Sequence, residues 1–182
     1  HVAGYVHANF EFPPYVRFPC LPVSAGEKGL IFPLKGETYC TASEILVAYN
    51  LGCKIEIIHG VIVPWAQTEH RVFEDIITKV RLERNQAKSD GDKPKDEVWK
   101  NIALQIYGKV SQAVSPVDKT AFDTRTNRSK SIGPSPISHE MMAAYTTGFI
   151  RGVMHELLNQ IPKEELVVSV TTDGFLTTAD IA

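Results

Sequence analysis

The sequence changes character near Thr68, and this change limits the folds that the chain can adopt. The first 65 residues are rich in strand-like runs, with one helix predicted in "TASEILVAYNLG", capped by Thr41 or Ser43 and ended by Gly52. Beyond Thr68, apolar residues recur at helical spacing in "TEHRVFEDIITKVRLERNQAKS" and "DEVWKNIALQIYGKVSQAV". Only six polar residues separate these stretches, which predicts an antiparallel helical pair. The order of elements therefore indicates an α+β protein.

Several other segments have patterns that predict local structure. Residues 1–12 predict a strand, "GLIFPLKGETYC" predicts a short hairpin around Gly36, and "KIEIIHGVIVPW" predicts two strand-like runs broken at His59-Gly60. Residues 114–138 are rich in Ser, Thr, Pro and Lys, which is typical of a mobile loop. The stretch "SHEMMAAYTTGFIRGVMHELLNQIP" predicts a long helix. Its apolar stripe consists of Met142, Tyr145, Phe149, Val153 and Leu157.

The stretch "SVTTDGFLTT", residues 169–178, is the strongest local signal in the sequence. Two runs of β-forming residues meet at Asp173-Gly174, a pair typical of a tight hairpin turn, so Asp173 should lie at the exposed tip. Two interpretations are open. Asp173 can serve the turn alone, with Gly174 supplying a positive φ angle, or its carboxylate can be functional. A lone carboxylate makes a poor metal site, because two-ion catalysis needs at least two acidic ligands.

Composition excludes some classes of protein. Hydrophobic residues make up 43% of the chain and charged residues 22%, which is ordinary for a globular protein. No apolar run approaches the roughly 20 residues that a membrane-spanning helix needs. The three cysteines, Cys20, Cys40 and Cys53, suggest neither a zinc site nor a complete disulfide framework, so we expect an intracellular, reducing setting. The start at His1, already inside a predicted strand, indicates a piece of a longer protein.

Cations gather in the predicted helical pair, although the net charge of the chain is −2. Arg81, Arg84 and Lys88 share one helical face, and Lys100 and Tyr107 share a face of the partner helix. Antiparallel packing can bring these faces together, and cations that converge on one spot need an anion between them. A triphosphate would satisfy them, because Arg and Lys bind phosphate oxygens well. The alternative is an ordinary solvated basic face.

The order of these features resembles that of the family B DNA polymerases, most closely their shorter branch encoded by viruses, plasmids and mobile elements. One motif of that family is Lys, three residues, Asn-Ser, any residue and Tyr-Gly. This chain matches it at Lys100, Tyr107 and Gly108, with Leu104 and Gln105 in place of Asn-Ser. A second motif is Asp-Thr-Asp-Ser at a hairpin tip, where this chain has Thr-Thr-Asp-Gly at residues 171–174. An Arg-x-x-x-Lys pattern on the family's fingers helix is matched by Arg84 and Lys88.

The resemblance implies a fold, an activity and a set of functional residues. The fold would be a polymerase palm sheet with a helical-hairpin fingers subdomain: residues 1–67 on the palm side, 68–113 as fingers, and 114–182 as palm helix and catalytic-type hairpin. The activity would be template-directed nucleotide transfer from dNTP to a DNA primer, with two Mg²⁺ ions. The residues implicated are Asp173 and Lys100 in catalysis, Asp173 as metal ligand, Arg81, Arg84, Lys88 and Lys100 at the dNTP triphosphate, and Tyr107 and Gly108 beside the nascent base pair.

The chain departs from the family in two respects. The motif Asp-x-x-Ser-x-Tyr-Pro, which supplies the other catalytic aspartate, is absent from these residues, so we expect it upstream in the remaining polymerase domains. Thr171 stands where the family has a further aspartate at the hairpin tip. We therefore expect these 182 residues to be inactive in isolation. The alternative is a catalytically degenerate polymerase-like module that binds DNA through its basic helical pair.

Overall fold

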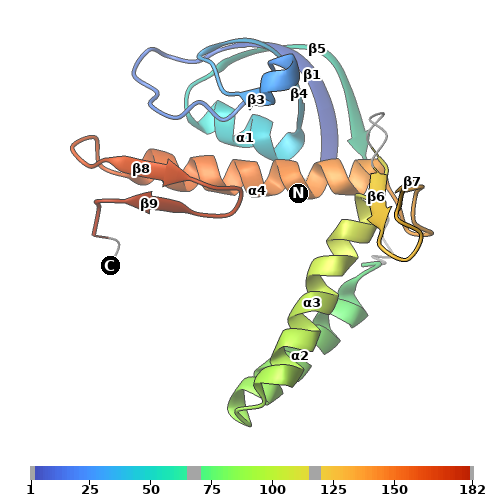
Figure 1. Cartoon of the computed structure of the whole chain (residues 1–182). Helices are drawn as coiled ribbons and strands as arrows, with labels where there is room; N and C mark the ends of the chain where they lie inside the picture. Colours follow the sequence, from blue (N-terminus) through green and yellow to red (C-terminus); the bar gives the residue numbers. More distant parts are fainter. Residues whose placement is uncertain (1–2, 65–70, 115–119, 181–182) are drawn as a thin grey trace. The chain divides into compact units, whose positions relative to one another are not determined.

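The computed structural model describes residues 3–64, 71–114 and 120–180 (Figure 1). The chain forms two compact units: the first joins His1–Ala66 to Ala144–Ala182, and the second is Gln67–Ala143. Helices and small antiparallel sheets occur together, which agrees with the predicted α+β class. Within the described ranges, none of the helices combines the length and the apolar character that crossing a bilayer requires.

A three-stranded antiparallel sheet forms one layer of the first unit. Its order is β4–β1–β5, with the bounds β1 Ala3–Glu11, β4 Lys35–Thr41 and β5 Lys54–Val63. The register of β1 and β5 shifts between His7 and Ala8, so that Ile58 bulges out of the ladder. Two short strands beside this sheet, β2 Val23–Ser24 and β3 Leu30–Ile31, pair with each other around the 3₁₀ turn Gly26–Lys28.

Helix α1 (Ala42–Asn50) packs against the sheet and encloses the core of this unit. The helix starts where the sequence predicts it, because Glu44 accepts a hydrogen bond from the Thr41 N–H at 2.8 Å. Gly52 follows its end with a φ angle of +78°, which glycine adopts without strain. The buried core cluster consists of Phe10, Phe12, Val16, Cys20, Leu21, Cys40, Ala48 and Cys53.

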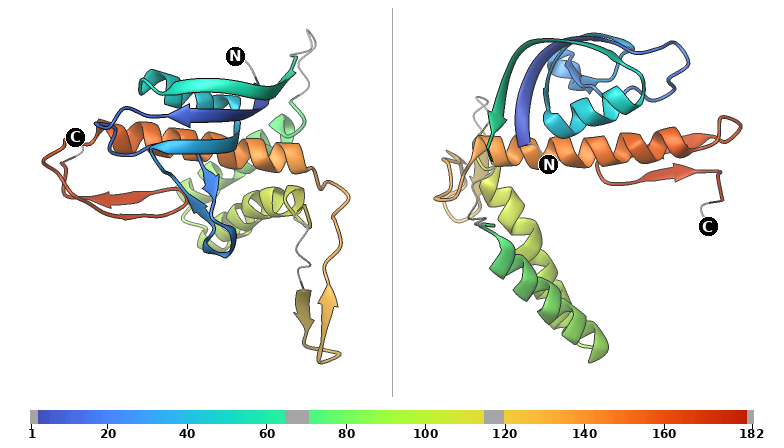
Figure 2. Two further views of the ribbon diagram at one scale, coloured as in Figure 1. Left: turned by 90° about the horizontal axis from the view of Figure 1, so that it is seen from above. Right: turned by 180° about the vertical axis from the view of Figure 1, so that it is seen from behind.

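Helix α4 (Glu140–Gln160) packs against α1 and also faces the sheet, where the rings of Tyr5 and Tyr145 lie 6.4 Å apart (Figures 1 and 2). Two glycines allow this approach. A Cβ atom on Gly148 would lie 2.5 Å from the Thr41 side chain and 2.7 Å from Glu44 Oε2, whereas on Gly152 it would lie 3.7 Å from its nearest neighbour. The apolar stripe predicted for this helix is not its buried face, since Phe149, Val153 and Leu157 are exposed.

We expect Gly148→Ala to destabilise the first unit, although alanine favours a helix more than glycine does. The added methyl group would overlap Thr41 and Glu44, and overpacking of this kind costs about 1–3 kcal/mol. Gly152→Ala is the matched control, because its methyl group finds ordinary contacts and can gain up to about 1 kcal/mol of helix propensity. Urea unfolding followed by circular dichroism compares the two free energies of unfolding. Equal free energies of unfolding for the two variants would contradict the close approach of α4 to α1.

The three cysteines are free and buried in the first unit. Burial raises the pKa of both the Cys20 and the Cys40 thiol to about 12, and it also raises the pKa of the Cys53 thiol. All three thiols are therefore protonated at neutral pH.

The second unit contains the predicted antiparallel helical pair, α2 (Glu74–Ser89) and α3 (Lys93–Val110). Residues 68–70, where the first helix was predicted to begin, lie outside the described residues. The turn is shorter than predicted because Pro94 lies in the first turn of α3, where a missing N–H costs no helical hydrogen bond. The Asp92 carboxylate caps this start by accepting the Lys95 N–H at 3.0 Å.

Three other sequence-based assignments were wrong. Residues 54–63 form one strand, because the bulge at Ile58 absorbs the irregularity that was interpreted as a break. The segment around Gly36 is not a hairpin, since β3 pairs with β2 and β4 pairs with β1. Within the predicted loop, β6 (Thr120–Asp123) and β7 (Arg128–Ser131) form a hairpin, while residues 115–119 lie outside the described residues. The two strands of this hairpin lack an alternating apolar pattern, so the sequence did not indicate the hairpin.

Candidate functional site

The C-terminal hairpin lies where the sequence predicts it. Strands β8 (Val167–Val170) and β9 (Phe175–Thr177) pair antiparallel, with Val170 opposite Phe175. Thr171 closes the turn, because its N–H and its hydroxyl donate to the Gly174 carbonyl at 2.7 and 3.0 Å. Thr172 and Asp173 therefore form the tip, where the Asp173 side chain is exposed.

The turn differs from the one that the Asp-Gly pair predicts. Gly174 does not adopt a positive φ angle, so that expectation was wrong. The chain reverses one residue earlier, around Thr172 and Asp173. In the described part of the chain, no hydrogen bond or ion pair to the Asp173 carboxylate is present. The carboxylate is thus not needed to hold the turn, and it is available to a ligand.

A cavity of about 610 Å³ lies beside this hairpin. Thr171 and Thr172 form part of its wall, and Arg17 and Arg151 also line it. Most of the other lining side chains are apolar and come from residues 18–32, from α4 and from β8. They include Phe18, Leu30, Phe32, Ile150, Met154, Leu158 and Val170. A concave surface therefore adjoins the hairpin tip within the first unit.

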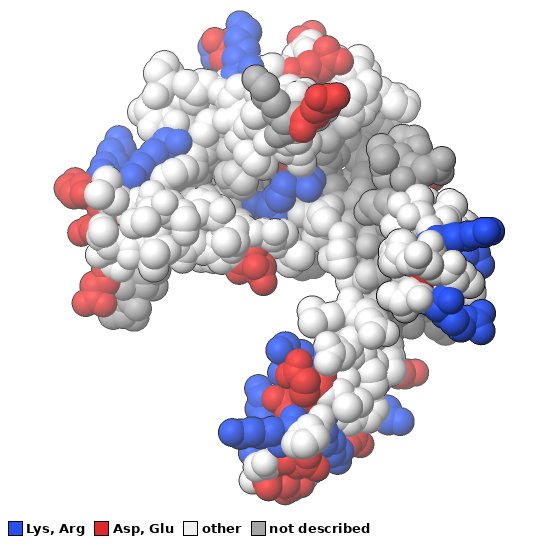
Figure 3. Space-filling model, viewed as in Figure 1, with Lys and Arg blue, Asp and Glu red and all other residues white. Residues whose placement is uncertain are grey.

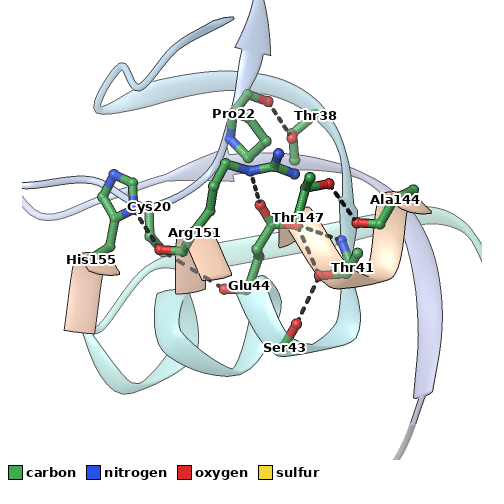
Figure 4. Close-up of polar contacts among 10 residues, drawn as sticks. All are labelled: Cys20, Pro22, Thr38, Thr41, Ser43, Glu44, Ala144, Thr147, Arg151 and His155. Atoms are coloured by element: carbon green, nitrogen blue, oxygen red, sulfur yellow. Dashed lines mark hydrogen bonds and ion pairs between the residues drawn. The ribbon is translucent and has the colours of Figure 1, made fainter. Parts of the chain in front are cut away.

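Arg151 is held in this wall by a buried carboxylate (Figure 4). Its Nε donates to Glu44 Oε1 at 2.8 Å, while Thr41 donates to Glu44 Oε2 through its N–H and its hydroxyl, at 2.8 and 2.9 Å. The Glu44 side chain has no exposed surface, whereas 26% of the Arg151 side chain is exposed. Arg151 is thus fixed at one nitrogen and can offer its other donors to an anion. Sequence analysis missed the pair of Arg151 and Glu44; the capping-box spacing Thr41-x-x-Glu44 signals only the contact between Thr41 and Glu44.

The described residues alone do not fit a metal site. Among residues 3–64, 71–114 and 120–180, no group of three or more His, Cys, Asp or Glu side chains could hold an ion. Asp173 is a single carboxylate, and Asp180 follows β9 at the opposite end of the hairpin. Further ligands for the two ions that the family resemblance implies would have to come from other residues of the protein.

Ion pairs join the two helices of the second unit. Arg84 Nε donates to Asp96 Oδ1 at 2.8 Å, and Lys95 Nζ lies 2.9 Å from Glu83 Oε2. A local pair on α3 joins Lys100 to Glu97 at 3.4 Å. The helical pair therefore carries mixed charges, and Figure 3 shows basic and acidic side chains interspersed over it.

Asp96 lies among the cations that the sequence assigns to phosphate binding. Hydrogen bonding to Arg84 lowers the pKa of the Asp96 carboxyl, and the charges of Arg84, Lys88 and Lys100 lower it further. The charges of these three predicted site residues thus act on one carboxylate, which among the described residues pairs with Arg84 alone. Sequence analysis placed Asp96 only near the start of the helix, and no local pattern pointed to its contact with Arg84 on the other helix.

The remaining predicted site residues are exposed on the same two helices. Arg81 lies one turn before Arg84 on α2, and its side chain is exposed. Tyr107 lies two turns after Lys100 on α3, is 39% exposed, and is followed by Gly108, where a Cβ atom would meet nothing within 4 Å. Leu104, at a position where the family motif has Asn, is 63% exposed between them. This face of α3 is therefore open to a ligand.

The β6–β7 hairpin carries further cations of the second unit. Arg125, Arg128 and Lys130 lie on it or in its turn, and all three are exposed. The Asp123 carboxylate stabilises the turn by accepting the N–H groups of Arg125 and Thr126, at 2.9 and 3.3 Å. Hydrogen bonding to the Arg125 N–H lowers the pKa of the Asp123 carboxyl. Asp123 is thus occupied by a local structural role.

Comparison with known proteins relates the chain to DNA polymerases. No family model matches it. The primer-independent DNA polymerase PolB of Escherichia coli is 42% identical over an alignment that covers 97% of this chain and 21% of that protein. Phi29 DNA polymerase complexed with primer-template DNA and incoming nucleotide substrates gives a TM-score of 0.64 at 14% identity, over 99% of this chain and 32% of that chain. The orthorhombic crystal form of Phi29 DNA polymerase gives a TM-score of 0.61 at 12% identity, over 99% of this chain and 33% of that chain.

Two conclusions follow from these comparisons. The sequence relative confirms the resemblance that the motifs indicated, and the structures show that the fold is shared. The chain spans about a fifth of the length of the curated relative and about a third of each solved chain.

Proposed function

We propose that this chain, which is related in sequence to the family B DNA polymerases, forms the palm and fingers of a template-directed DNA polymerase. The observation that carries the proposal is the 42% identity to PolB over 97% of the chain. Support comes from the shared fold with Phi29 DNA polymerase, whose structure holds primer-template DNA and incoming nucleotide. The activity is proposed for the whole protein, acting inside the cell on a primed DNA template with dNTP, because the chain spans 21% of its relative.

In the proposed enzyme, the first unit is the palm. Asp173, exposed at the hairpin tip, supplies one ligand of the two Mg²⁺ ions that such enzymes use to activate the nucleophile and neutralise phosphate charge. The other ligands come from the parts of the protein outside this chain. Arg151 borders the cavity beside the tip, and we assign it to a phosphate of the bound substrates.

The helical pair of the second unit is the fingers. Its cations neutralise the triphosphate of the incoming dNTP, and Lys100 continues to do so as charge develops in the transition state. The exposed ring of Tyr107 packs beside the nascent base pair, and Gly108 leaves room for it. The triphosphate ligands in this assignment are Arg81, Arg84, Lys88 and Lys100.

A second function is favoured by two replacements in the same motifs. The tip carries one carboxylate, since Thr171 stands where the family has an aspartate, and the exposed Leu104 stands where the family has Asn. A polymerase-like module that binds DNA without catalysis tolerates both replacements. An Asp-x-x-Ser-x-Tyr-Pro motif in the parent protein distinguishes the two, because it supplies the second catalytic carboxylate that only the enzyme needs.

The proposal is tested with the chain itself beside the whole protein. We expect residues 1–182 to bind primer-template DNA weakly, without sequence preference, and to give no templated extension with Mg²⁺ or Mn²⁺. The affinity should fall steeply as salt rises, because each phosphate contact releases condensed counterions. Replacing Arg81, Lys88 and Lys100 of the helical pair together by alanine should reduce the slope of log affinity against log salt by about 2–3.

Two results would count against this proposal. Templated extension by residues 1–182 would show that the complete catalytic site lies within this chain. Binding that did not respond to salt would remove the electrostatic basis for DNA recognition. The whole protein, assayed under the same conditions, should extend the primer if the enzyme interpretation is right.

A further inference from the structure

We propose that Asp96 is an internal counter-ion that competes with the nucleotide triphosphate for Arg84 and thereby sets the affinity of the fingers for dNTP. The inference rests on the proposed function, because it takes the cationic face of α2 and α3 as the triphosphate site. Asp96 Oδ1 lies 2.8 Å from Arg84 Nε, and the two side chains are 25% and 31% exposed. Both side chains are partly exposed, so a ligand can reach the pair from solvent.

The surroundings of Asp96 differ from those of a carboxylate that only ties two helices together. Lys88 lies one turn beyond Arg84 on α2, Lys100 lies one turn beyond Asp96 on α3, and the charges of both act on Asp96. Within the described residues, Lys88 has no ion-pair partner of its own, and Lys100 has only the exposed Glu97 at 3.4 Å. The charges of three cations thus act on one carboxylate that, among the described residues, pairs with Arg84 alone, and an anion of higher charge would satisfy them better.

The neighbouring pair of Glu83 and Lys95 provides an internal comparison. It joins the same two helices at 2.9 Å, and its side chains are similarly exposed, at 35% and 40%. Hydrogen bonding to Glu83 raises the pKa of Lys95, and the nearby charges of Asp90 and Asp92 add to this effect. Glu83 therefore pairs with a lysine that has other carboxylates near it, and its loss removes a tie between the helices without releasing Arg84.

A triphosphate has to displace Asp96 before the Nε–H of Arg84 can donate to it; while the pair is formed, Arg84 offers a phosphate only its Nη donors, and the negative charge of Asp96 repels the phosphate. That donor points in one direction, so it cannot serve the carboxylate and a phosphate oxygen fully at the same time. Nucleotide binding is weakened by the fraction of molecules in which the Arg84–Asp96 pair is formed. For a pair as exposed as this one, removing the competitor should strengthen nucleotide binding by about three- to fivefold.

The test measures steady-state primer extension by the whole protein as the dNTP concentration is varied. Asp96→Asn removes the charge and keeps the shape, so the KM for dNTP should fall about three- to fivefold with kcat within about twofold. Asp96→Glu retains a carboxylate and should stay near the wild-type KM. Glu83→Gln is the matched control and should leave the KM unchanged. If the two pairs only hold the helices together, both Asp96→Asn and Glu83→Gln will instead raise the KM.

Further variants separate this inference from the proposed function. Lys100→Ala should raise the KM for dNTP, and no change would overturn the phosphate role of this face and the inference with it. If Lys100→Ala raises the KM while Asp96→Asn does not lower it, the face binds triphosphate and only the inference is overturned. In an Arg84→Ala background, Asp96→Asn should have no further effect on the KM, because the competition acts through Arg84.

Discussion

Asp173→Asn in the whole protein should lower kcat for primer extension by at least about 10³-fold while DNA binding is retained. Asparagine preserves the size of the side chain, and the turn itself is held by Thr171 and the Gly174 carbonyl rather than by the carboxylate. What is lost is the charge of the proposed metal ligand, which should cost about 4 kcal/mol of transition-state stabilisation. Rapid-quench primer extension measures kcat, and fluorescence anisotropy of labelled primer-template measures binding.

Asp180→Asn is the matched control on the same hairpin. Asp180 follows β9 at the end opposite the tip, so its loss should change kcat by less than about twofold. Wild-type kcat in Asp173→Asn would show that the metal role assigned to the tip is wrong. Loss of activity in Asp180→Asn alone would move the catalytic carboxylate to the other end of the hairpin.

Glu44→Ala should lower the free energy of unfolding of the chain by about 3 kcal/mol, because it leaves Arg151 unpaired in a largely buried site. The same change removes the acceptor of the Thr41 N–H at the start of α1. Because 26% of the Arg151 side chain is exposed, water compensates part of the loss, and the lower end of the range for broken buried ion pairs applies.

Two further variants make the Glu44 measurement specific. Glu44→Gln keeps the volume and one acceptor, so it should cost an intermediate amount of about 1–2 kcal/mol. Glu11 pairs with Lys35 at 3.3 Å on the surface, where the side chains are 57% and 73% exposed, so Glu11→Gln should change stability by less than about 0.5 kcal/mol. Urea unfolding measures all three variants. If Glu44→Ala lowers the free energy of unfolding no more than Glu11→Gln does, the buried carboxylate does not stabilise the chain as we expect.

Elements with strong local signals were predictable from the sequence. The start of α1 depends on Thr41 and the C-terminal hairpin on two short β-forming runs, so a window of about ten residues contains the information. The exact form of the turn was not predictable from the same window. The Thr171 N–H and hydroxyl close the turn on the Gly174 carbonyl, and this shifts the reversal away from the Asp-Gly pair.

Features set by distant neighbours were not predictable. A helical period identifies apolar stripes on α4, but it does not say which face meets another helix. Gly148 decides this, because a side chain at this position would overlap Thr41 and Glu44. The sequence identified the cations of the helical pair and the exposed Asp173. It did not identify Glu44 as the partner of Arg151, because the two residues lie 107 positions apart in the chain.

The burial of the three cysteines makes site-specific labelling straightforward. Maleimides react with the thiolate form, and thiols whose pKa is raised to about 12, as in Cys20 and Cys40, contain almost no thiolate at neutral pH. A cysteine introduced at an exposed position of α3, such as Asn101, would therefore be the reactive thiol among these 182 residues, with the native cysteines left in place. A fluorophore attached there would report the arrival of nucleotide as a change in its emission.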